Sequence, residues 1–173
     1  ETFEPVAVNA AIDEERVTIV SVVPNMLQRL IEARGERPFP PSLRCVLVGG
    51  GPVPRPLLEE CARRALPAVQ TYGLTEAASQ VTTLAPEEAL TRLGSAGKPL
   101  FPTEVSIQRE DGSPCGPAEA GEICIRGPSV MTSYLNRPDE TAMAWRGDWF
   151  HTGDIGRLDE EGYLFVLDRR DDL

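Results

Sequence analysis

Three short apolar runs alternate with two amphipathic segments in the first half of the chain, and this alternation restricts the fold more than any other feature. The runs cover residues 17–23, 43–48 and 68–72, and their continuous apolar character is typical of strands covered on both faces. Pro24 and Pro54 stand where the intervening helices would begin. The order β-α-β-α-β predicts an α/β fold with a parallel sheet and right-handed crossovers.

The second half of the chain has a different pattern. Short apolar segments at 103–109, 121–127 and 162–167 are separated by residues that favour turns. They predict a small antiparallel, barrel-like β-rich module. We therefore expect an α/β part over residues 1–95 and a β-rich subdomain over residues 96–167.

Composition excludes several classes of function. A net charge of −10 argues against a nucleic-acid surface, which needs a basic footprint. The sequence contains no apolar run of 18 residues, so we expect no membrane span. The four cysteines form no C-x-x-C pair and there is one histidine, which argues against a structural zinc site and favours buried thiols in a reducing cytoplasm.

Residues suited to a nucleotide follow two of the expected strands. Gly49–Gly51 come after the second run, and Tyr72, Thr75 and Glu76 come at the end of the third. In open α/β sheets ligands bind outside the carboxyl ends of the strands, so we expect these residues on one edge. Glycine allows close approach of a ligand, Tyr72 offers a stacking face, Thr75 a donor for phosphate and Glu76 a hard oxygen for magnesium.

Each of these features also has an ordinary structural explanation. Gly49–Gly51 could be a tight turn, and Pro54 breaks the G-x-G-x-x-G dinucleotide pattern. Thr75-Glu76 could be the start of a helix. Asp154, between two glycines, could receive a ribose diol or could be an aspartate in a glycine turn. For His151 a packed or solvated ring is favoured over a general base.

Four motifs together resemble the adenylate-forming superfamily of acyl-CoA synthetases, luciferases and peptide-synthetase adenylation domains. They are "TYGLTE" (71–76), "GEICIRGPSVMTSYLNRP" (121–138), "FHTGD" (150–154) and "DRRDDL" (168–173), in family order. The continuation of the first motif, with "GSAGKPLFP" (94–102), is most similar to 2-succinylbenzoate–CoA ligases of menaquinone biosynthesis. The resemblance implies activation of a carboxylic acid by ATP and transfer of the acyl group to coenzyme A.

The resemblance also implies roles for individual residues. Those that would contact ATP are Gly49, Gly50, Gly51, Tyr72, Gly73, Thr75, Asp154 and Arg169. Tyr72 would stack on adenine, and Thr75 would hydrogen-bond the α-phosphate. Glu76 would hold Mg²⁺, which makes Thr75 and Glu76 the expected catalytic pair. Asp154 and Arg169 would bind the ribose hydroxyls.

The remaining implied roles concern the acyl group and a hinge. Gly73 would form part of the acyl tunnel, and Ser79 and Gln80 are candidates for the acyl pocket. The glycines at 49–51 would border both adenine and the acyl group. Asp171 would be the hinge of a C-terminal domain whose connection starts at residues 168–173.

The 173 residues depart from the family pattern in two places. The phosphate loop that precedes these motifs and the C-terminal domain with its catalytic lysine are absent, so we expect the 173 residues alone to be inactive. Lys98 lies in a G-K-P stretch that we expect to form a turn, so it does not take the role of that lysine. A fatty-acid or aryl-CoA ligase and a non-enzymatic nucleotide-binding module are the alternatives. The expected partners are a small carboxylic acid, ATP and coenzyme A, without nucleic acid or membrane; a homodimer is left open.

Overall fold

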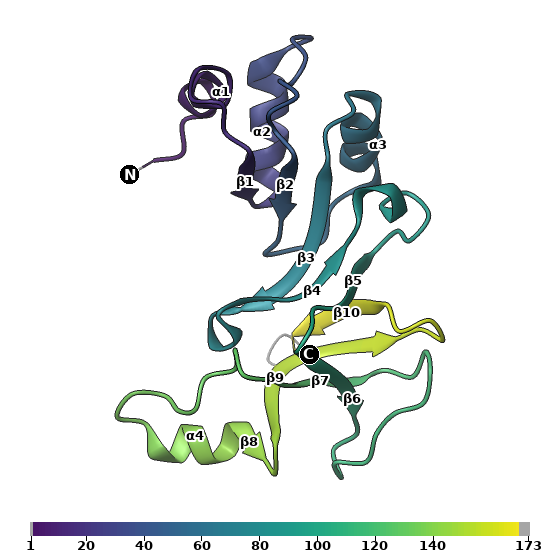
Figure 1. Cartoon of the computed structure of the whole chain (residues 1–173). Helices are drawn as coiled ribbons and strands as arrows, with labels where there is room; N and C mark the ends of the chain where they lie inside the picture. Colours follow the sequence, from purple (N-terminus) through teal and green to yellow (C-terminus); the bar gives the residue numbers. More distant parts are fainter. Residues whose placement is uncertain (1, 170–173) are drawn as a thin grey trace. The chain divides into compact units, whose positions relative to one another are not determined.

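The computed structural model describes residues 2–169, except for the side chain of Arg169 (Figure 1). The helices are α1 (Pro5–Glu14), α2 (Pro24–Arg34), α3 (Arg55–Arg63) and α4 (Pro138–Ala144), with 3-10 turns η1 (Thr75–Ala77) and η2 (Pro86–Glu88). The strands are β1 (Ile19–Val22), β2 (Cys45–Val48), β3 (Ala68–Leu74), β4 (Ser79–Leu84), β5 (Ser95–Pro99), β6 (Glu104–Gln108), β7 (Gly121–Arg126), β8 (Trp145–Arg146), β9 (Trp149–Leu158) and β10 (Leu164–Arg169). None of the described helices is long and apolar enough to cross a membrane.

The chain divides into two compact units. Unit 1 runs to Thr71 and resumes at Leu84–Gly94, and unit 2 consists of Tyr72–Thr83 and the chain from Ser95 onward. The sequence pattern did not indicate that Tyr72–Thr83 belong with the second unit. Tyr72, Gly73, Thr75 and Glu76 are therefore in the same unit as Asp154.

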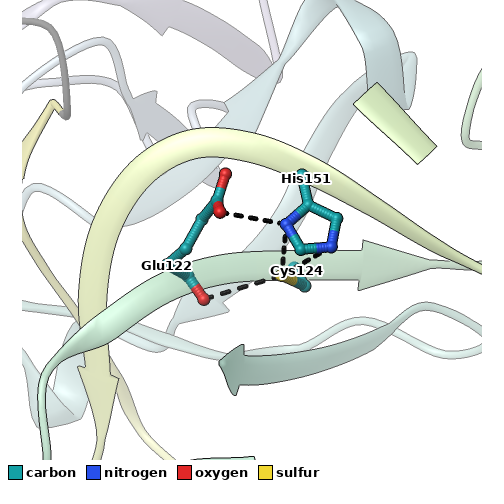
Figure 2. A group of neighbouring side chains, drawn as sticks. All are labelled: Glu122, Cys124 and His151. Atoms are coloured by element: carbon teal, nitrogen blue, oxygen red, sulfur yellow. Dashed lines mark hydrogen bonds and ion pairs between the residues drawn. The ribbon is translucent and has the colours of Figure 1, made fainter. Parts of the chain in front are cut away.

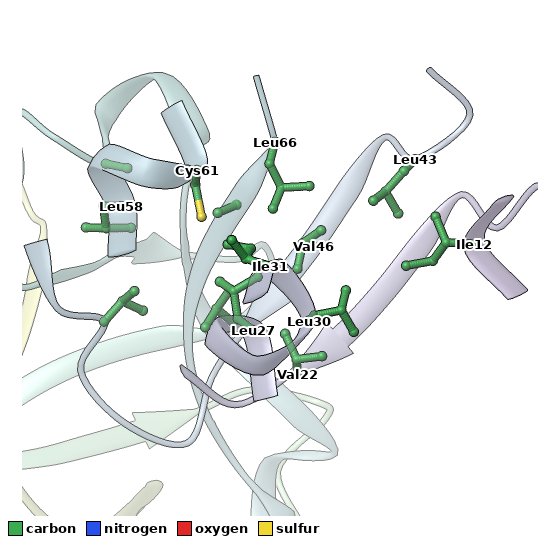
Figure 3. Close-up of a cluster of buried hydrophobic side chains, with 14 residues drawn as sticks. Ile12, Val22, Leu27, Leu30, Ile31, Leu43, Val46, Leu58, Cys61 and Leu66 are labelled. Carbon is green, nitrogen blue, oxygen red and sulfur yellow. The ribbon is translucent and has the colours of Figure 1, made fainter. Parts of the chain in front are cut away.

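Unit 1 has the predicted α/β architecture. Strand β2 pairs in parallel with β1 and with β3, with Val46 opposite both Val20 and Ala68. On α2, Leu27, Leu30 and Ile31 recur at the spacing of one helical face and are buried in the core around Val46 (Figure 3). Burial alternates along these strands: successive residues of β2 are half-buried and buried, whereas β1 exposes Ile19 (54%) and Ser21. The expectation that all three strands are covered on both faces was therefore wrong for β1.

A buried arginine ties the last turn of α2 to α1. The side chain of Arg34 is 2% exposed, and its guanidinium lies 2.5 Å from an oxygen of Asp13 and 2.9 Å from Oδ1 of Asn9. It also donates to the carbonyl of Pro38 at 2.7 Å. A guanidinium can be buried at acceptable cost only when its donors are satisfied in this way.

Unit 2 is the predicted antiparallel part. Strands β4, β5, β10, β9, β7 and β6 are neighbours in that order, and β8 pairs with β9. Its core includes Phe150, Ile123, Ile125, Leu164 and Val81, each at most 2% exposed. A parallel segment followed by antiparallel strands confirms the predicted fold class.

Three local readings of the sequence were wrong. The stretch around Asp154 is a ten-residue strand, β9, and not a glycine turn, because it pairs with β7 on one side and β10 on the other. Strand β3 continues past Tyr72 to Leu74. Lys98, which we expected in a turn, lies in β5 with its ammonium 4.4 Å from the ring centre of Tyr163.

Two backbones approach closely where β3 meets β4. A Cβ on Gly73 would stand 1.6 Å from the carbonyl oxygen of Ser79 and 3.0 Å from Cα of Gln80. The connection bends through Ala78 and Ser79, which have φ values of 52° and 95°. Only glycine fits at position 73, because any side chain would overlap the facing backbone.

Candidate active site

Two motifs that are 82 positions apart in the sequence meet in unit 2. The hydroxyl of Tyr72, near the end of β3, donates a hydrogen bond of 2.6 Å to Oδ2 of Asp154 on β9. Tyr72 is 9% exposed and Asp154 is half-buried. The contact brings the expected adenine platform next to the expected ribose-binding carboxylate.

The backbone around Asp154 is fixed by hydrogen bonds from β7. Gly153 has φ +76°, and its N–H donates to Oε1 of Glu122 at 3.2 Å. The hydroxyl of Thr152 donates to the carbonyl of Ile123 at 2.7 Å and accepts the N–H of Asp154 at 3.1 Å. These bonds hold the backbone before Asp154 in place, so they set the direction in which its carboxylate leaves the strand.

Glu76 is held at two points by the segment that precedes α4. Its side chain accepts a hydrogen bond of 2.8 Å from the hydroxyl of Tyr134 at Oε1, and its carbonyl accepts the N–H of Met131 at 2.7 Å. Glu76 is half-buried in the short η1 turn. A carboxylate with a fixed position and partial access to solvent suits a hard divalent cation.

The neighbours of Glu76 are more exposed. Thr75 opens η1 and its side chain faces solvent; the cap position is Leu74, which makes no side-chain cap. The structure therefore does not support the reading of Thr75-Glu76 as the start of an α-helix. Ser79 is exposed at the start of β4, and Gln80 is half-buried with its amide 3.4 Å from the hydroxyl of Thr83.

Other expected site residues are not brought together by the described contacts. Gly49, Gly50 and Gly51 follow β2 in unit 1, where a Cβ on Gly49 would meet the Thr71 hydroxyl at 2.8 Å. That these glycines border the same site as Tyr72 stays a prediction.

Two expected residues belong to the end of the chain. Arg169 lies opposite Asp154 in the β9–β10 register. Asp171, the expected hinge, lies outside the described residues.

A second group of polar side chains lies on β7 and β9. His151 is buried, and its Nδ1 is 2.9 Å from Oε2 of Glu122 and 3.4 Å from Sγ of Cys124 (Figure 2). Burial, with the nearby Glu122 carboxylate, raises the pKa of the Cys124 thiol to about 12. The expectation of a packed His151 is confirmed.

Sequence reasoning gave no role to Glu122, Thr152 or Tyr134, although these residues position Asp154 and Glu76. A signal was available for all three. Glu122 and Tyr134 lie within the stretch 121–138 and Thr152 within the stretch 150–154, and both stretches were matched to the family. The spacing alone could not show which partners they contact, because the contacts depend on strand register.

Comparison with known proteins identifies the family of the chain. The family model of AMP-binding enzymes matches residues 1–135. The chain belongs to the AMP-binding enzyme family. The match covers the glycines after β2, the Tyr72–Glu76 motif and Glu122, whereas Asp154 lies beyond it.

Several individual relatives are CoA ligases or synthetases. The 2-succinylbenzoate–CoA ligase of Geobacillus kaustophilus is 58% identical over 172 residues, covering 99% of this chain and 35% of the relative. The O-succinylbenzoate coenzyme A synthetase of Bacillus subtilis in complex with ATP and magnesium ion is 49% identical with a TM-score of 0.93, covering 99% of this chain and 35% of that one. A fatty acyl CoA synthetase of Mycobacterium tuberculosis is 36% identical with a TM-score of 0.89, covering 99% and 34%. The chain thus spans about a third of the length of these relatives.

Proposed function

We propose that the full-length protein activates a carboxylic acid with ATP and transfers the acyl group to coenzyme A, with 2-succinylbenzoate as the acid. The observation that carries this proposal is the hydrogen bond between Tyr72 on β3 and Asp154 on β9, which joins an aromatic platform to a carboxylate. Similarity to a 2-succinylbenzoate–CoA ligase, at 58% identity, supports the choice of acid over the fatty acids of the 36% identical relative.

Different residues bind different parts of the nucleotide. Tyr72 stacks on adenine, and the Asp154 carboxylate accepts hydrogen bonds from the ribose hydroxyls. Arg169, opposite Asp154 in register, supports the same ribose. Thr75, exposed at the start of η1, donates to the α-phosphate. The glycines at 49–51 border adenine and the acyl group.

The reaction has two displacement steps. A carboxylate oxygen of the acid attacks the α-phosphorus, and the bond to pyrophosphate breaks. The sulfur of coenzyme A then attacks the acyl carbon, and AMP leaves. This chain contributes positioning and charge neutralisation rather than a covalent intermediate.

Glu76 would hold the magnesium ion that accompanies ATP. Its carboxylate fits, because Mg²⁺ is usually bound by one or two carboxylates together with substrate phosphates. When bound, the ion supplies positive charge beside the phosphate oxygens. The hydrogen bond from Tyr134 orients the carboxylate without removing its charge.

The acyl group lies against the hairpin of β3 and β4. Gly73 forms part of the tunnel wall there, because it lets the two backbones approach closely, and Ser79 and Gln80 contact the acid. Asp171 acts as the hinge for the C-terminal domain. We further propose a cytoplasmic enzyme that binds no nucleic acid and no membrane; the chain's four cysteines are free thiols, which suits a reducing compartment.

Substitution of Asp154 by Asn in the full-length protein tests the nucleotide site. The amide oxygen can still accept the Tyr72 hydroxyl, so the melting temperature should change by less than about 2 °C, since each kcal/mol is worth a few degrees. Loss of the charged acceptor should weaken ATP binding by about 1.5–3 kcal/mol, or roughly 10- to 150-fold in Kd. Calorimetric titration with ATP and thermal unfolding measure the two effects.

Asp159→Asn is the matched control. Asp159 accepts the N–H groups of Glu161 and Tyr163 in the β9–β10 turn, at 3.0 and 2.9 Å. The asparagine oxygen can still accept both N–H groups, so this substitution should leave both the melting temperature and the Kd for ATP nearly unchanged. If Asp154→Asn also leaves the Kd for ATP unchanged, or if it lowers the melting temperature by several degrees, the proposed role of Asp154 in nucleotide binding is wrong.

A further inference from the structure

Three metal-binding side chains of different types converge on one face of the β7–β9 pair. Glu122 and Cys124 are two positions apart on β7, so their side chains project to the same face. His151 lies directly opposite Cys124 in the antiparallel register. One ligand atom from each residue lies within 4.8 Å of the other two (Figure 2). The linear sequence hides this group, because it has none of the usual C-x-x-C spacing.

The separations are close to those that a tetrahedral ion requires. With bonds of about 2.0–2.1 Å to nitrogen or oxygen and about 2.3 Å to sulfur, neighbouring N and O ligands stand about 3.3 Å apart, and N and S about 3.5 Å apart. The observed values are 2.9 Å between His151 Nδ1 and Glu122 Oε2, and 3.4 Å between His151 Nδ1 and Cys124 Sγ. The nitrogen and the oxygen need to separate by only a few tenths of an ångström, and the nitrogen and the sulfur already fit. The carboxylate oxygen and the sulfur lie within 4.8 Å of each other and need to approach by at most about 1.3 Å.

The imidazole ring of His151 must also rotate to bind an ion. Sγ of Cys124 is 3.4 Å from Nδ1 and 3.8 Å from Nε2 of His151, so the sulfur lies beside the ring rather than on the axis of either nitrogen. Turning the imidazole about its Cβ–Cγ bond would direct a nitrogen lone pair at an ion held between the carboxylate and the sulfur.

The group has access to solvent on one side. Glu122 and His151, with side chains 11% and 5% exposed, line an open cavity of about 590 Å³, whereas Cys124 lies beneath them and is fully buried. An ion can enter from this cavity and keep a water molecule as its fourth ligand. The cavity also receives the proton that the Cys124 thiol releases when it binds as a thiolate.

We propose that Glu122, Cys124 and His151 form a binding site for a zinc-class divalent cation. Mixed sulfur, nitrogen and oxygen ligands select Zn²⁺ or Co²⁺ over Mg²⁺, which prefers oxygen ligands alone. The site shares no ligand with the carboxylate of Glu76, which we assign to magnesium. It does not depend on the proposed ligase activity.

Cobalt titration of the chelator-stripped full-length protein tests the proposal. One equivalent of Co²⁺ should produce visible tetrahedral bands and a near-ultraviolet thiolate-to-cobalt charge-transfer band, and Zn²⁺ should abolish both. Cys124→Ser should remove the charge-transfer band and weaken Zn²⁺ binding at least tenfold. Cys45→Ser, which changes a half-buried thiol on β2, is the matched control and should leave both unchanged.

X-ray absorption of the zinc-loaded wild-type protein gives a measurement that does not depend on a variant folding. One sulfur at about 2.3 Å, with nitrogen or oxygen at about 2.0 Å, is expected. The proposal is overturned if the zinc shell contains no sulfur, if wild-type protein gives no charge-transfer band, or if the band persists in folded Cys124→Ser protein.

Discussion

Replacing Gly73 by alanine should destabilise unit 2 more than its single added methyl group suggests. The new Cβ would stand 1.6 Å from the carbonyl oxygen of Ser79, and real Cβ atoms essentially never approach other atoms within 3.0 Å. The facing backbone must therefore move by at least 1.4 Å. Ala78 and Ser79 already have positive φ values, so the hairpin has little freedom to yield.

The magnitude follows from the cost of overpacking. Such insertions cost about 1–3 kcal/mol, and a clash with backbone belongs at the upper end. A domain of about 150–250 residues loses about 2–4 °C per kcal/mol and a larger one loses less, so the melting temperature of the full-length protein should fall by several degrees and by at most about 12 °C. Because Ser79 and Gln80 are proposed acyl-pocket residues, the same displacement should raise the KM for the acid more than the KM for ATP.

Thermal unfolding of the full-length protein, with Gly51→Ala as control, measures the effect. Gly51 has no atom within 4 Å of the added Cβ and no positive φ, so alanine there should be neutral or slightly stabilising. A Gly73→Ala protein that melts within about 1 °C of wild type would refute the reasoning, because it would mean that β3 and β4 are not in contact at this point.

Two further predictions concern charged groups in unit 1. Hydrogen bonds from Arg63 and Arg64 lower the pKa of Glu60 from 4.5 to about 2. Because the pKa of Glu60 is lower in the folded state than in the unfolded chain, its carboxylate stabilises the fold at pH values above the unfolded pKa. The melting temperature of wild type should therefore exceed that of Glu60→Gln by the full amount above pH 4.5, and this difference should vanish towards pH 2. A difference that does not depend on pH would contradict this. Arg34→Met should destabilise by about 3 kcal/mol, because it leaves buried acceptors without a donor. Arg55→Met, the control, removes an exposed ion pair with Glu59 and should cost under about 0.5 kcal/mol. Urea titration of both variants measures the free energy of unfolding, and equal losses in the two variants would refute the argument.

The parallel part of the fold could be predicted because local signals agree with burial. Pro24 begins α2, and the apolar face of that helix follows from the spacing of Leu27, Leu30 and Ile31. Strand β9 could not be predicted, because Gly153 and Gly156 resemble turn residues when read alone. Pairing with β7 and β10 on both sides decides its conformation, and that information is not local.

The candidate site, like the fold, could be predicted only where local motifs carry the information. Motif resemblance predicted Tyr72, Glu76 and Asp154 as site residues, and the structure adds that Tyr72 contacts Asp154 directly. The motifs could not indicate that Tyr134 is the partner of Glu76, or that Glu122, Cys124 and His151 form a group. Those contacts join residues about 30 to 60 positions apart, and only the register of the strands and the path of the connections bring them together.

Thermal unfolding of the full-length protein with two non-hydrolysable acyl-adenylate mimics tests the central claim most directly. One mimic carries the succinylbenzoyl group and the other a fatty-acyl group. A ligand at a hundred times its Kd stabilises the folded state by about 2.7 kcal/mol, which gives a clear shift in melting temperature. We predict a shift with the succinylbenzoyl mimic that is much larger than with the fatty-acyl mimic and is reduced by Asp154→Asn. A larger shift with the fatty-acyl mimic would contradict the proposed acid, and no shift with either would contradict the adenylate site itself.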